Sequence, residues 1–305
     1  MKLLSFYKGS PKDSRVGVVY KDGKVIDLVS LYEYLYGYPP DWLTDLTKLL
    51  EGGSPAFRLV NELIDDFKKL DTNITSNFLL DEDNITFLPV VRPRKVFCVA
   101  VNYNEHGKEA GSASIEEPYI FMKRVDTLVA HRQPILIPKI SSQVDHEIEL
   151  AVIIGKKGKY ISSKEAYEYI AGYTIFNDVS FRDLRKHSSP RYNINWLYAK
   201  NLDTASPIGP YLVTKDEIQD PHNLTIRLEV NGEIRQNGHT SSMIHKIPEL
   251  IEYVSNGITL YPGDVISTGT PSGTGLGTGK FLKEGDVMVG YIEKIGKLEN
   301  RIMRE

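Results

Sequence analysis

The first 90 residues carry short hydrophobic patterns that alternate between strand-like and helix-like spacing. Apolar and polar positions alternate at 16–20 and 24–28, on either side of an Asp-Gly turn typical of a β-hairpin. A helix is predicted to begin with Ser54 as N-cap and Pro55 at its first position, with an apolar stripe formed by Phe57, Leu59, Val60, Leu63, Ile64 and Phe67. We therefore expect a small N-terminal α+β domain that ends near residue 90.

The remainder of the chain carries mostly strand patterns. Apolar segments bounded by Gly, Pro, Asn and Asp recur at 148–154, 173–179, 208–213, 224–230 and 286–292. One helix is expected after Ser162 and Glu165, which have the spacing of a capping box. Many strands separated by turns favour a rolled or barrel-like β core over regular strand–helix alternation. The predicted fold class is α+β and β-rich, with an accessory domain at residues 1–90 and a main domain at residues 91–305.

Composition and charge limit the kinds of partner that the protein can have. The 305 residues include 37 Lys and Arg against 40 Asp and Glu, a net charge of -3, without a basic cluster. We therefore expect a small-molecule substrate, with neither nucleic acid nor a membrane as partner. Cys98 lies in an apolar run and is expected to be a buried hydrophobic side chain. The start is too poor in apolar residues for a signal peptide, and no run approaches about 18 apolar residues, so we expect a cytoplasmic location.

Two glutamates share one face of a predicted strand. Alternation places Glu147 and Glu149 on the same face, with Ile148 between them on the other. Adjacent carboxylates repel each other unless a cation lies between them. An edge strand with a solvated acidic pair explains this segment equally well. The neighbouring His146 faces the opposite side, which favours a packing role.

A third carboxylate shifts the interpretation towards a metal site. Asp178 lies at the end of the apolar segment 173–179, where aspartate is often only a turn former or a helix cap. Three carboxylates on adjacent strands, however, form a hard-cation site that suits Mg²⁺ or Mn²⁺, with Ca²⁺ able to replace them in crystals. Such a site leaves about three octahedral positions for water and a chelating substrate, as in a Lewis-acid catalyst.

Several separate motifs resemble, in their order, the fumarylacetoacetate hydrolase family. The similarity is greatest to its acylpyruvate hydrolase, decarboxylase and 2-hydroxyhepta-2,4-diene-1,7-dioate isomerase members. The motifs are NYNEH at 102–106, VDHEIELA at 144–151, AGYTIFNDVS at 171–180, AK at 199–200, VNGEIRQ at 230–236 and TGTP at 268–271. The resemblance covers roughly residues 94–300. It implies a β-rich roll, a homodimer, a 2-oxo acid substrate and a role in aromatic catabolism.

The resemblance also implies roles for individual residues. Glu147, Glu149 and Asp178 match the metal ligands of the family. His106 and Glu109 match a catalytic dyad on a mobile segment, 102–118, that closes over the site. Their spacing of three residues places both on one side of a short helix. Without the resemblance, an exposed surface helix is the simpler interpretation of this polar segment.

Other matching positions concern the substrate. Lys200 matches a catalytic substrate contact, and Arg182 and Thr270 match pocket residues around the substrate carboxylate or oxo group. The chain departs from the family after Arg182-Asp183, where Leu184-Arg185 stands in place of the usual glutamine. Arg185 therefore indicates an additional anionic group on the substrate, such as a second carboxylate.

From these residues we expect a divalent-metal-dependent hydrolase that cleaves a carbon–carbon bond of an acylpyruvate. His106, oriented by Glu109, would deprotonate a water molecule, and the metal and Lys200 would stabilise the pyruvate enolate that leaves. The same enolate also serves an isomerase or a decarboxylase acting on a dicarboxylic 2-hydroxydienoate or on oxaloacetate. A non-catalytic protein, in which the ion only holds strands together, is the alternative from another class.

The glycine-rich segment 269–280 does not match a phosphate-binding loop. Thr274 stands where that motif requires its first glycine, and Phe281 follows Lys280 where serine or threonine is required. We expect instead a flexible loop whose backbone amides lie near the substrate.

Overall fold

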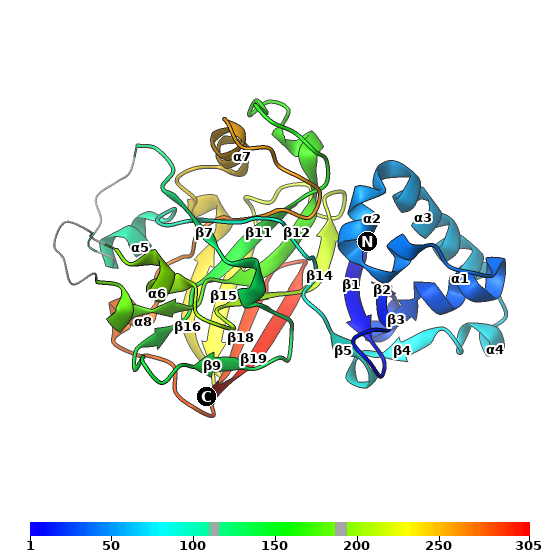
Figure 1. Cartoon of the computed structure of the whole chain (residues 1–305), viewed down its shortest axis with the longest axis horizontal. Coiled ribbons are helices and arrows are strands. Elements are labelled where there is room, and N and C mark those ends of the chain that lie inside the picture. Colours follow the sequence, from blue (N-terminus) through cyan, green and yellow to red (C-terminus); the bar gives the residue numbers. More distant parts are fainter. Residues whose placement is uncertain (110, 112–115, 187–193) are drawn as a thin grey trace.

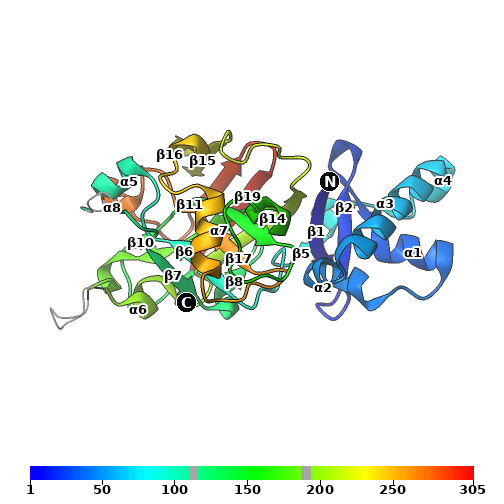
Figure 2. The ribbon, with the colours of Figure 1, turned by 90° about the horizontal axis from the view of Figure 1, so that it is seen from above.

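The computed structural model of the chain describes residues 1–109, 111, 116–186 and 194–305. Figures 1 and 2 show two parts side by side, a lobe formed by the N-terminal residues and a larger β-rich part. The closing movement predicted for segment 102–118 involves residues 110 and 112–115, which lie outside the described residues.

The N-terminal lobe combines short strands with helices (Figure 1). Its elements are β1 (Lys2–Tyr7), β2 (Ser14–Val19), β3 (Lys24–Asp27), α1 (Leu28–Tyr36), α2 (Leu46–Glu51), α3 (Gly53–Lys69), α4 (Thr72–Thr75), β4 (Leu79–Asp81) and β5 (Thr86–Phe87). The predicted hairpin is confirmed, with Asp22 and Gly23 both at positive φ in its turn. The predicted helix is confirmed as α3, but Ser54 is not its N-cap, because the helix already begins at Gly53 without a side-chain cap.

The larger part consists of strands with short helices between them. Its strands are β6 (Val96–Val99), β7 (Ile120–Lys123), β8 (Leu128–Val129), β9 (Ile135–Ile137), β10 (Val144–Asp145), β11 (Ile148–Ile154), β12 (Ile170–Asn177), β13 (Ser180–Phe181), β14 (Ser206–Thr214), β15 (Thr225–Val230), β16 (Glu233–His239), β17 (Val265–Ser267), β18 (Val287–Ile292) and β19 (Gly296–Arg304). Its helices are α5 (Asn104–Glu109), α6 (Trp196–Lys200), α7 (Ile247–Ser255) and α8 (Gly275–Thr278). Single turns of 3-10 helix occur in both parts. Those of the lobe are Lys21–Gly23, Asp41–Thr44 and Glu82–Asn84, and those of the larger part are Val125–Thr127, Ala166–Tyr169, Arg182–Leu184 and Thr240–Ser242.

Two sheets face each other in the larger part, and the first of them continues into the N-terminal lobe. The first has twelve strands, in the order β4-β3-β2-β1-β14-β12-β11-β17-β6-β7, with β5 paired to β1 and β8 to β14. The second has five, in the order β16-β15-β18-β19-β9. Gly290 of β18 lies so close to β11 that a Cβ atom there would be 2.3 Å from Cδ1 of Ile148. The predicted β-rich α+β class is confirmed, although neither sheet closes into a barrel within the described residues.

All five apolar segments predicted in the larger part are strands, namely β11, β12, β14, β15 and β18. The helix predicted after Ser162 is wrong. The Ser162 hydroxyl does donate to Oε2 of Glu165 at 2.7 Å, but only one 3-10 turn follows before β12 begins. Pairing of β12 with β11 and β14 outweighs this local capping signal. The longest helix of this part is α7, which carries Pro248 in its first turn and was not predicted.

The hydrophobic core continues across the two parts. Strand β1 pairs with β14, with Leu3 opposite Leu212. One cluster of buried side chains joins Leu49 and Val60 of the lobe to Phe176 and Leu212 of the larger part. The sheet and its core therefore extend over the predicted boundary near residue 90, which stays a prediction.

Leu212→Ala tests whether the two parts unfold as one unit. Leu212 is fully buried, so its truncation should lower the free energy of unfolding by about 2–5 kcal/mol through lost burial and the cavity left behind. Urea unfolding followed by circular dichroism should show one transition at a lower midpoint. Ile140→Ala, at a residue 57% exposed, is the control and should change the stability by less than about 0.5 kcal/mol. Two transitions, with only one of them shifted, would contradict a shared core.

Candidate metal centre and active site

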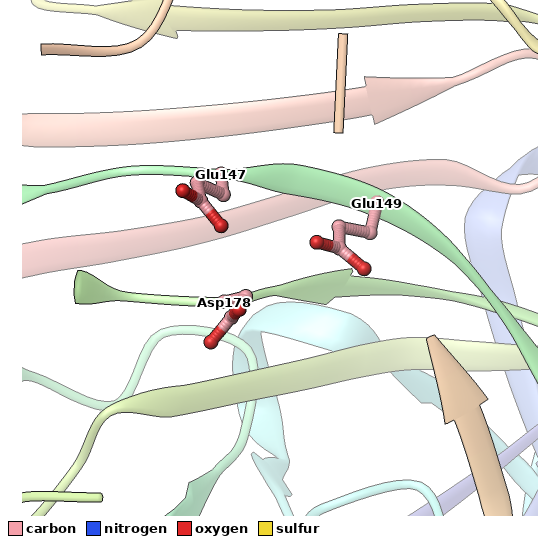
Figure 3. Close-up of side chains that lie close together, drawn as sticks. All are labelled: Glu147, Glu149 and Asp178. Atoms are coloured by element: carbon pink, nitrogen blue, oxygen red, sulfur yellow. The ribbon is translucent and has the colours of Figure 1, made fainter. Parts of the chain in front are cut away.

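Two antiparallel strands bring the three predicted metal ligands together. Glu147 directly precedes β11, Glu149 lies within it, and Asp178 directly follows β12. In the register of this pair Ile148 lies opposite Asn177, and the Asp178 N–H donates to the Glu147 carbonyl oxygen at 2.9 Å. The three carboxylates are buried and lie close together (Figure 3), with one oxygen of each within 4.8 Å of the others. The strand pairing alone therefore creates a cluster of three hard oxygen donors.

The opposite face of this strand region is occupied by neutral polar contacts. Nδ1 of His146 lies 3.1 Å from Oε1 of Gln236, which supports the packing role predicted for His146. The Gln236 amide donates to the hydroxyl of Thr270 at 2.8 Å, and that hydroxyl donates to the Ile148 carbonyl oxygen at 2.7 Å. The Thr270 hydroxyl is thus engaged by the protein itself, and its substrate contact stays a prediction.

Three buried cations bind the carboxylate cluster. Nζ of Lys200 donates to Oε2 of Glu147 at 2.7 Å and to Oδ2 of Asp178 at 2.6 Å. Lys123 donates to the other Asp178 oxygen at 2.6 Å, and the Arg182 guanidinium donates to Glu147. The sequence analysis missed Lys123. Its signal was a lysine inside the apolar strand β7, where an unpaired ammonium is costly.

Asp145 is a second buried residue that the sequence analysis missed. Its carboxylate accepts from Nε of Arg182 at 2.7 Å and from the backbone amides of Gly275 and Leu276 at 2.5 and 2.9 Å. It therefore fixes the guanidinium that also binds Glu147. Its position two residues before a glutamate pair was a sequence signal, but its partners are more than 30 residues away.

Glu149 has no cationic partner among the described residues. It accepts hydrogen bonds from the Ser267 hydroxyl at 2.5 Å and from the Gly269 N–H at 2.9 Å, both neutral donors. Burial, followed by the negative charges of Asp178 and Glu147, raises the pKa of Glu149 from 4.5 to about 8. The cluster thus contains one carboxylate whose charge the protein does not compensate.

The pKa of Glu147 shifts in the opposite direction. Burial alone would raise its pKa, but the charges of Lys200 and Arg182 hold the pKa of this carboxyl well below its usual range. Glu147 is therefore a permanent anion beside the undercompensated Glu149. Buried carboxylate oxygens with a deficit of positive charge are the donors that Mg²⁺ and Mn²⁺ prefer, so this donor set fits a divalent cation.

The predicted dyad lies beside the carboxylate cluster. His106 and Glu109 are both on α5, and Nδ1 of His106 lies 3.5 Å from Oε2 of Glu109, slightly beyond hydrogen-bond distance. The other ring nitrogen lies 3.9 Å from Oε1 of Glu147. Burial tends to raise the pKa of Glu109, but contact with His106 and the N–H of Gly273 lower it below the usual value. The imidazole is thus placed between a carboxylate that can orient it and the candidate metal centre.

A small cavity of about 90 Å³ opens beside these groups. Five of the predicted site residues line it, namely His106, Glu147, Arg182, Arg185 and Lys200. Thr270 and Glu109 are not among the described residues that line it. Positive side chains and one imidazole therefore surround a space directly beside Glu147.

Another part of the lining is aromatic. The rings of Phe121 and Trp196 stack at a centroid distance of 4.4 Å, and Tyr119 meets Trp196 edge-on at 5.7 Å. All three of these aromatic residues line the cavity. A flat apolar wall opposite charged groups excludes water and favours planar, conjugated substrates.

Known proteins are similar to this chain in sequence over most of its length. The family model described as fumarylacetoacetate (FAA) hydrolase C-terminal matches residues 95–303. The chain is 38% identical over 307 residues to the mitochondrial oxaloacetate tautomerase fahd2 of Xenopus laevis, which covers 99% of this chain and 90% of that protein.

Two solved structures share the whole fold. The 2-hydroxyhepta-2,4-diene-1,7-dioate isomerase of Mycobacterium marinum is 28% identical, with a TM-score of 0.72, over 100% of this chain and 99% of the other. The maleylpyruvate hydrolase of Sphingobium sp. SYK-6, solved with manganese(II) and pyruvate, is 26% identical, with a TM-score of 0.77 and the same coverage. The manganese in that structure and the buried acidic cluster here both indicate a divalent metal.

Glu149→Gln tests the charge deficit. Because the pKa of Glu149 is raised on folding, the metal-free protein should lose stability as the pH rises from about 4.5 to about 8, since the unfolded chain is ionised here and folding must take up a proton. The melting temperature in EDTA should therefore fall across this range. In Glu149→Gln this fall should be smaller, by on the order of several degrees.

The same measurements with Mn²⁺ provide the complementary test. Mn²⁺ should raise the melting temperature of the unaltered protein at pH 8 by preferential binding to the folded state, but not that of Glu149→Gln. Asp286→Asn, at a partly exposed residue outside the cluster, is the control and should respond like the unaltered protein. Equal stabilisation of all three proteins by Mn²⁺ would remove Glu149 from the metal site.

Proposed function

This chain belongs to the fumarylacetoacetate hydrolase family of enzymes, and we propose that it transfers a proton on a 2-oxo dicarboxylic acid such as oxaloacetate, interconverting its keto and enol forms with the help of Mg²⁺ or Mn²⁺. The observation that carries the proposal is the position of the His106 imidazole, 3.9 Å from Glu147 in a small cavity lined by positive side chains. The oxaloacetate tautomerase of Xenopus laevis supports it over nearly the full chain.

The size of the cavity supports a small substrate. One water-sized group needs about 10–15 Å³ of such space, so about 90 Å³ holds a molecule of the size of a four-carbon diacid. Arg182 is held by Asp145 and Glu147, whereas Arg185 also lines the cavity from the turn after β13. Two guanidinium groups at one small cavity favour a substrate with two carboxylates.

The residues of the chain divide the chemistry among them. A divalent ion held by Glu147, Glu149 and Asp178 would supply positive charge beside the 2-oxo group. His106 acts as the base that takes a proton from the carbon next to the oxo group and returns it to oxygen. Glu109 orients the imidazole.

Lys200 contributes a fixed positive charge. An ammonium group has three N–H donors, and two of those of Lys200 bind Glu147 and Asp178. The third is available to the substrate oxygen on which negative charge develops. Burial opposes the charge of this ammonium, but Asp178 and Glu147 raise the pKa of Lys200 above its usual value, so it stays protonated.

Hydrolysis of an acylpyruvate is the second candidate, and the sequence analysis ranked it first. The maleylpyruvate hydrolase that shares this fold supports it, and so does the His106–Glu109 dyad, which could equally activate a water molecule. Isomerisation of a dicarboxylic dienoate and decarboxylation of oxaloacetate use the same enolate. We place proton transfer first because it needs one base and no space for an attacking water.

Three expectations from the sequence stay predictions, namely the homodimer, the cytoplasmic location and the role in aromatic catabolism. Among the described residues, no helix has both the length and the apolar character needed to span a bilayer.

His106→Ala tests the assigned base. With Mn²⁺ present, the rate of oxaloacetate ketonisation, followed by the loss of enol absorbance, should fall by about 100-fold or more, because a positioned general base contributes about 10²–10⁴-fold. Mn²⁺ affinity should stay unchanged.

A panel of acetylpyruvate, maleylpyruvate and a 2-hydroxydienedioate, analysed by NMR, identifies the reaction. Pyruvate formation from the acylpyruvates without any tautomerase activity would favour the hydrolase over our proposal.

Arg185→Gln tests the second carboxylate of the substrate. If Arg185 binds it, KM for oxaloacetate should rise by about tenfold or more, since a charge-assisted bidentate contact is worth about 1.5–3 kcal/mol, whereas turnover of the monocarboxylate acetylpyruvate should not change. Lys186→Gln, which removes a neighbouring exposed charge, is the control. An equal loss with both substrates would refute a role of Arg185 in selecting diacids.

A further inference from the structure

The glycine-rich segment at 273–277 holds carboxylates of the protein itself. The N–H of Gly273 donates to Oε1 of Glu109 at 2.8 Å. The amides of Gly275 and Leu276 donate to the two oxygens of Asp145 at 2.5 and 2.9 Å. The segment therefore contacts the dyad on α5 and the strand region that precedes Glu147 at the same time.

Gly275 and Gly277 of this segment must be glycines because no space is left for a Cβ atom beside these carboxylates. A Cβ atom on Gly277 would lie 2.6 Å from Cδ and 2.7 Å from Oε1 of Glu109. A Cβ atom on Gly275 would lie 2.6 Å from Oδ1 of Asp145. Real Cβ atoms do not approach other atoms this closely, so the segment lies against both carboxylates with no room for side chains.

The path of the backbone in this segment is itself fixed. Gly273 has a φ of +100°, and a Cβ atom there would lie 2.0 Å from the carbonyl oxygen of Arg235. Any other residue would clash with the backbone of β16 at this point. The amide that binds Glu109 is therefore supported by a strand and not by a freely moving loop.

Glu109 lies between this segment and His106. One of its oxygens accepts from Gly273, and the other faces Nδ1 of His106 at 3.5 Å. That imidazole nitrogen is buried and has no hydrogen-bond partner among the described residues, so Glu109 is the acceptor nearest to it that the structure shows. The place of the Glu109 carboxylate thus decides which orientation of the ring is stabilised.

The same segment is also connected to the metal side of the site. Asp145 binds Arg182, and Arg182 binds Glu147. The segment at 273–277 is consequently connected to the carboxylate cluster by hydrogen bonds through Asp145 and Arg182, and to the base by the contact of Glu109 with His106. Neither connection includes the substrate, so the arrangement exists before a substrate enters.

We propose that the segment at 273–277 is the positioning element of the dyad, and that residue 277 must be glycine because any side chain there displaces the Glu109 carboxylate from His106. The proposal rests on the proposed function, in which His106 is the base. Gly277 is a positioning residue, since it acts through Glu109 and does not line the cavity.

The effect of residue 277 on Glu109 can be distinguished from an effect on folding. The atoms that a Cβ on Gly277 would meet belong to the end of a flexible side chain, so Glu109 can rotate away while the backbone stays in place. Gly277 also lies within the short helix α8, where alanine is favoured over glycine by about 1 kcal/mol. Gly277→Ala should therefore fold normally and still lose the orientation of His106.

Kinetics of Gly277→Ala provide the first test. We expect kcat to fall by about 10- to 100-fold, as for a misplaced catalytic group, with KM, Mn²⁺ affinity and melting temperature unchanged. In a Glu109→Ala background, the same substitution should have no further effect on kcat, because the carboxylate that it displaces is gone. Gly9→Ala, where a Cβ meets no atom within 4 Å, is the control and should leave kcat unchanged. An equal loss of kcat in both backgrounds, or a loss of Mn²⁺ affinity, would overturn the proposal.

A spectroscopic test does not depend on turnover. In protein labelled with ¹³C-histidine, the resonance of His106 is assigned by its disappearance in His106→Asn. In Gly277→Ala it should move to the position that it takes in Glu109→Ala, whereas Gly9→Ala should leave it in place. If His106 keeps its resonance in Gly277→Ala, the positioning role is wrong even when the enzyme is active. If the resonance moves and no 2-oxo acid is converted, the positioning role holds and the proposed function fails.

Discussion

The site depends on one electrostatic constraint, the burial of Glu149 among other carboxylates. Removing an ion from water costs several kcal/mol, and nearby like charges add to this cost, so a buried carboxylate stays ionised only beside a positive charge. Lys123, Lys200 and Arg182 compensate the neighbours of Glu149 but do not contact it. A divalent cation would supply the missing positive charge. It would bind beside Glu149, whose hydrogen-bond donors are neutral.

The sheet keeps this unfavourable cluster in place. Glu147 and Glu149 belong to the region of β11, a strand that is buried along its whole length and paired on both sides, with β12 and β17. Ser267 at the end of β17 and Gly269 just after it bind Glu149 directly. Ligands held by paired strands lose little conformational entropy when an ion binds, because the strands are already fixed by the core. The same pairing continues through β14 into the N-terminal lobe, so the candidate metal centre is built on the twelve-stranded sheet.

The groups to which we assign the choice of reaction lie on less regular elements. His106 is on a short helix, Arg185 follows a single 3-10 turn, and the segment at 273–277 leads from a loop into the short helix α8. Changes in such elements would alter the proposed second carboxylate site or the orientation of the proposed base without disturbing the strands that carry the candidate ligands. This division explains how relatives with the same fold bear the names of a tautomerase, an isomerase and a hydrolase.

The sequence by itself determined the features that depend on local spacing. Alternation placed Glu147 and Glu149 on one face, apolar runs located the strands, and together they indicated a β-rich fold with an acidic site. The helix that local spacing predicted after Ser162 was wrong, because strand pairing in the sheet outweighed the capping signal. Only the tertiary structure decided which charges meet, because Lys123 and Asp178 are 55 residues apart, and Gly273 and Glu109 are 164 apart. Contacts over such distances follow from the register and packing of the sheets, which no periodicity within a single segment encodes.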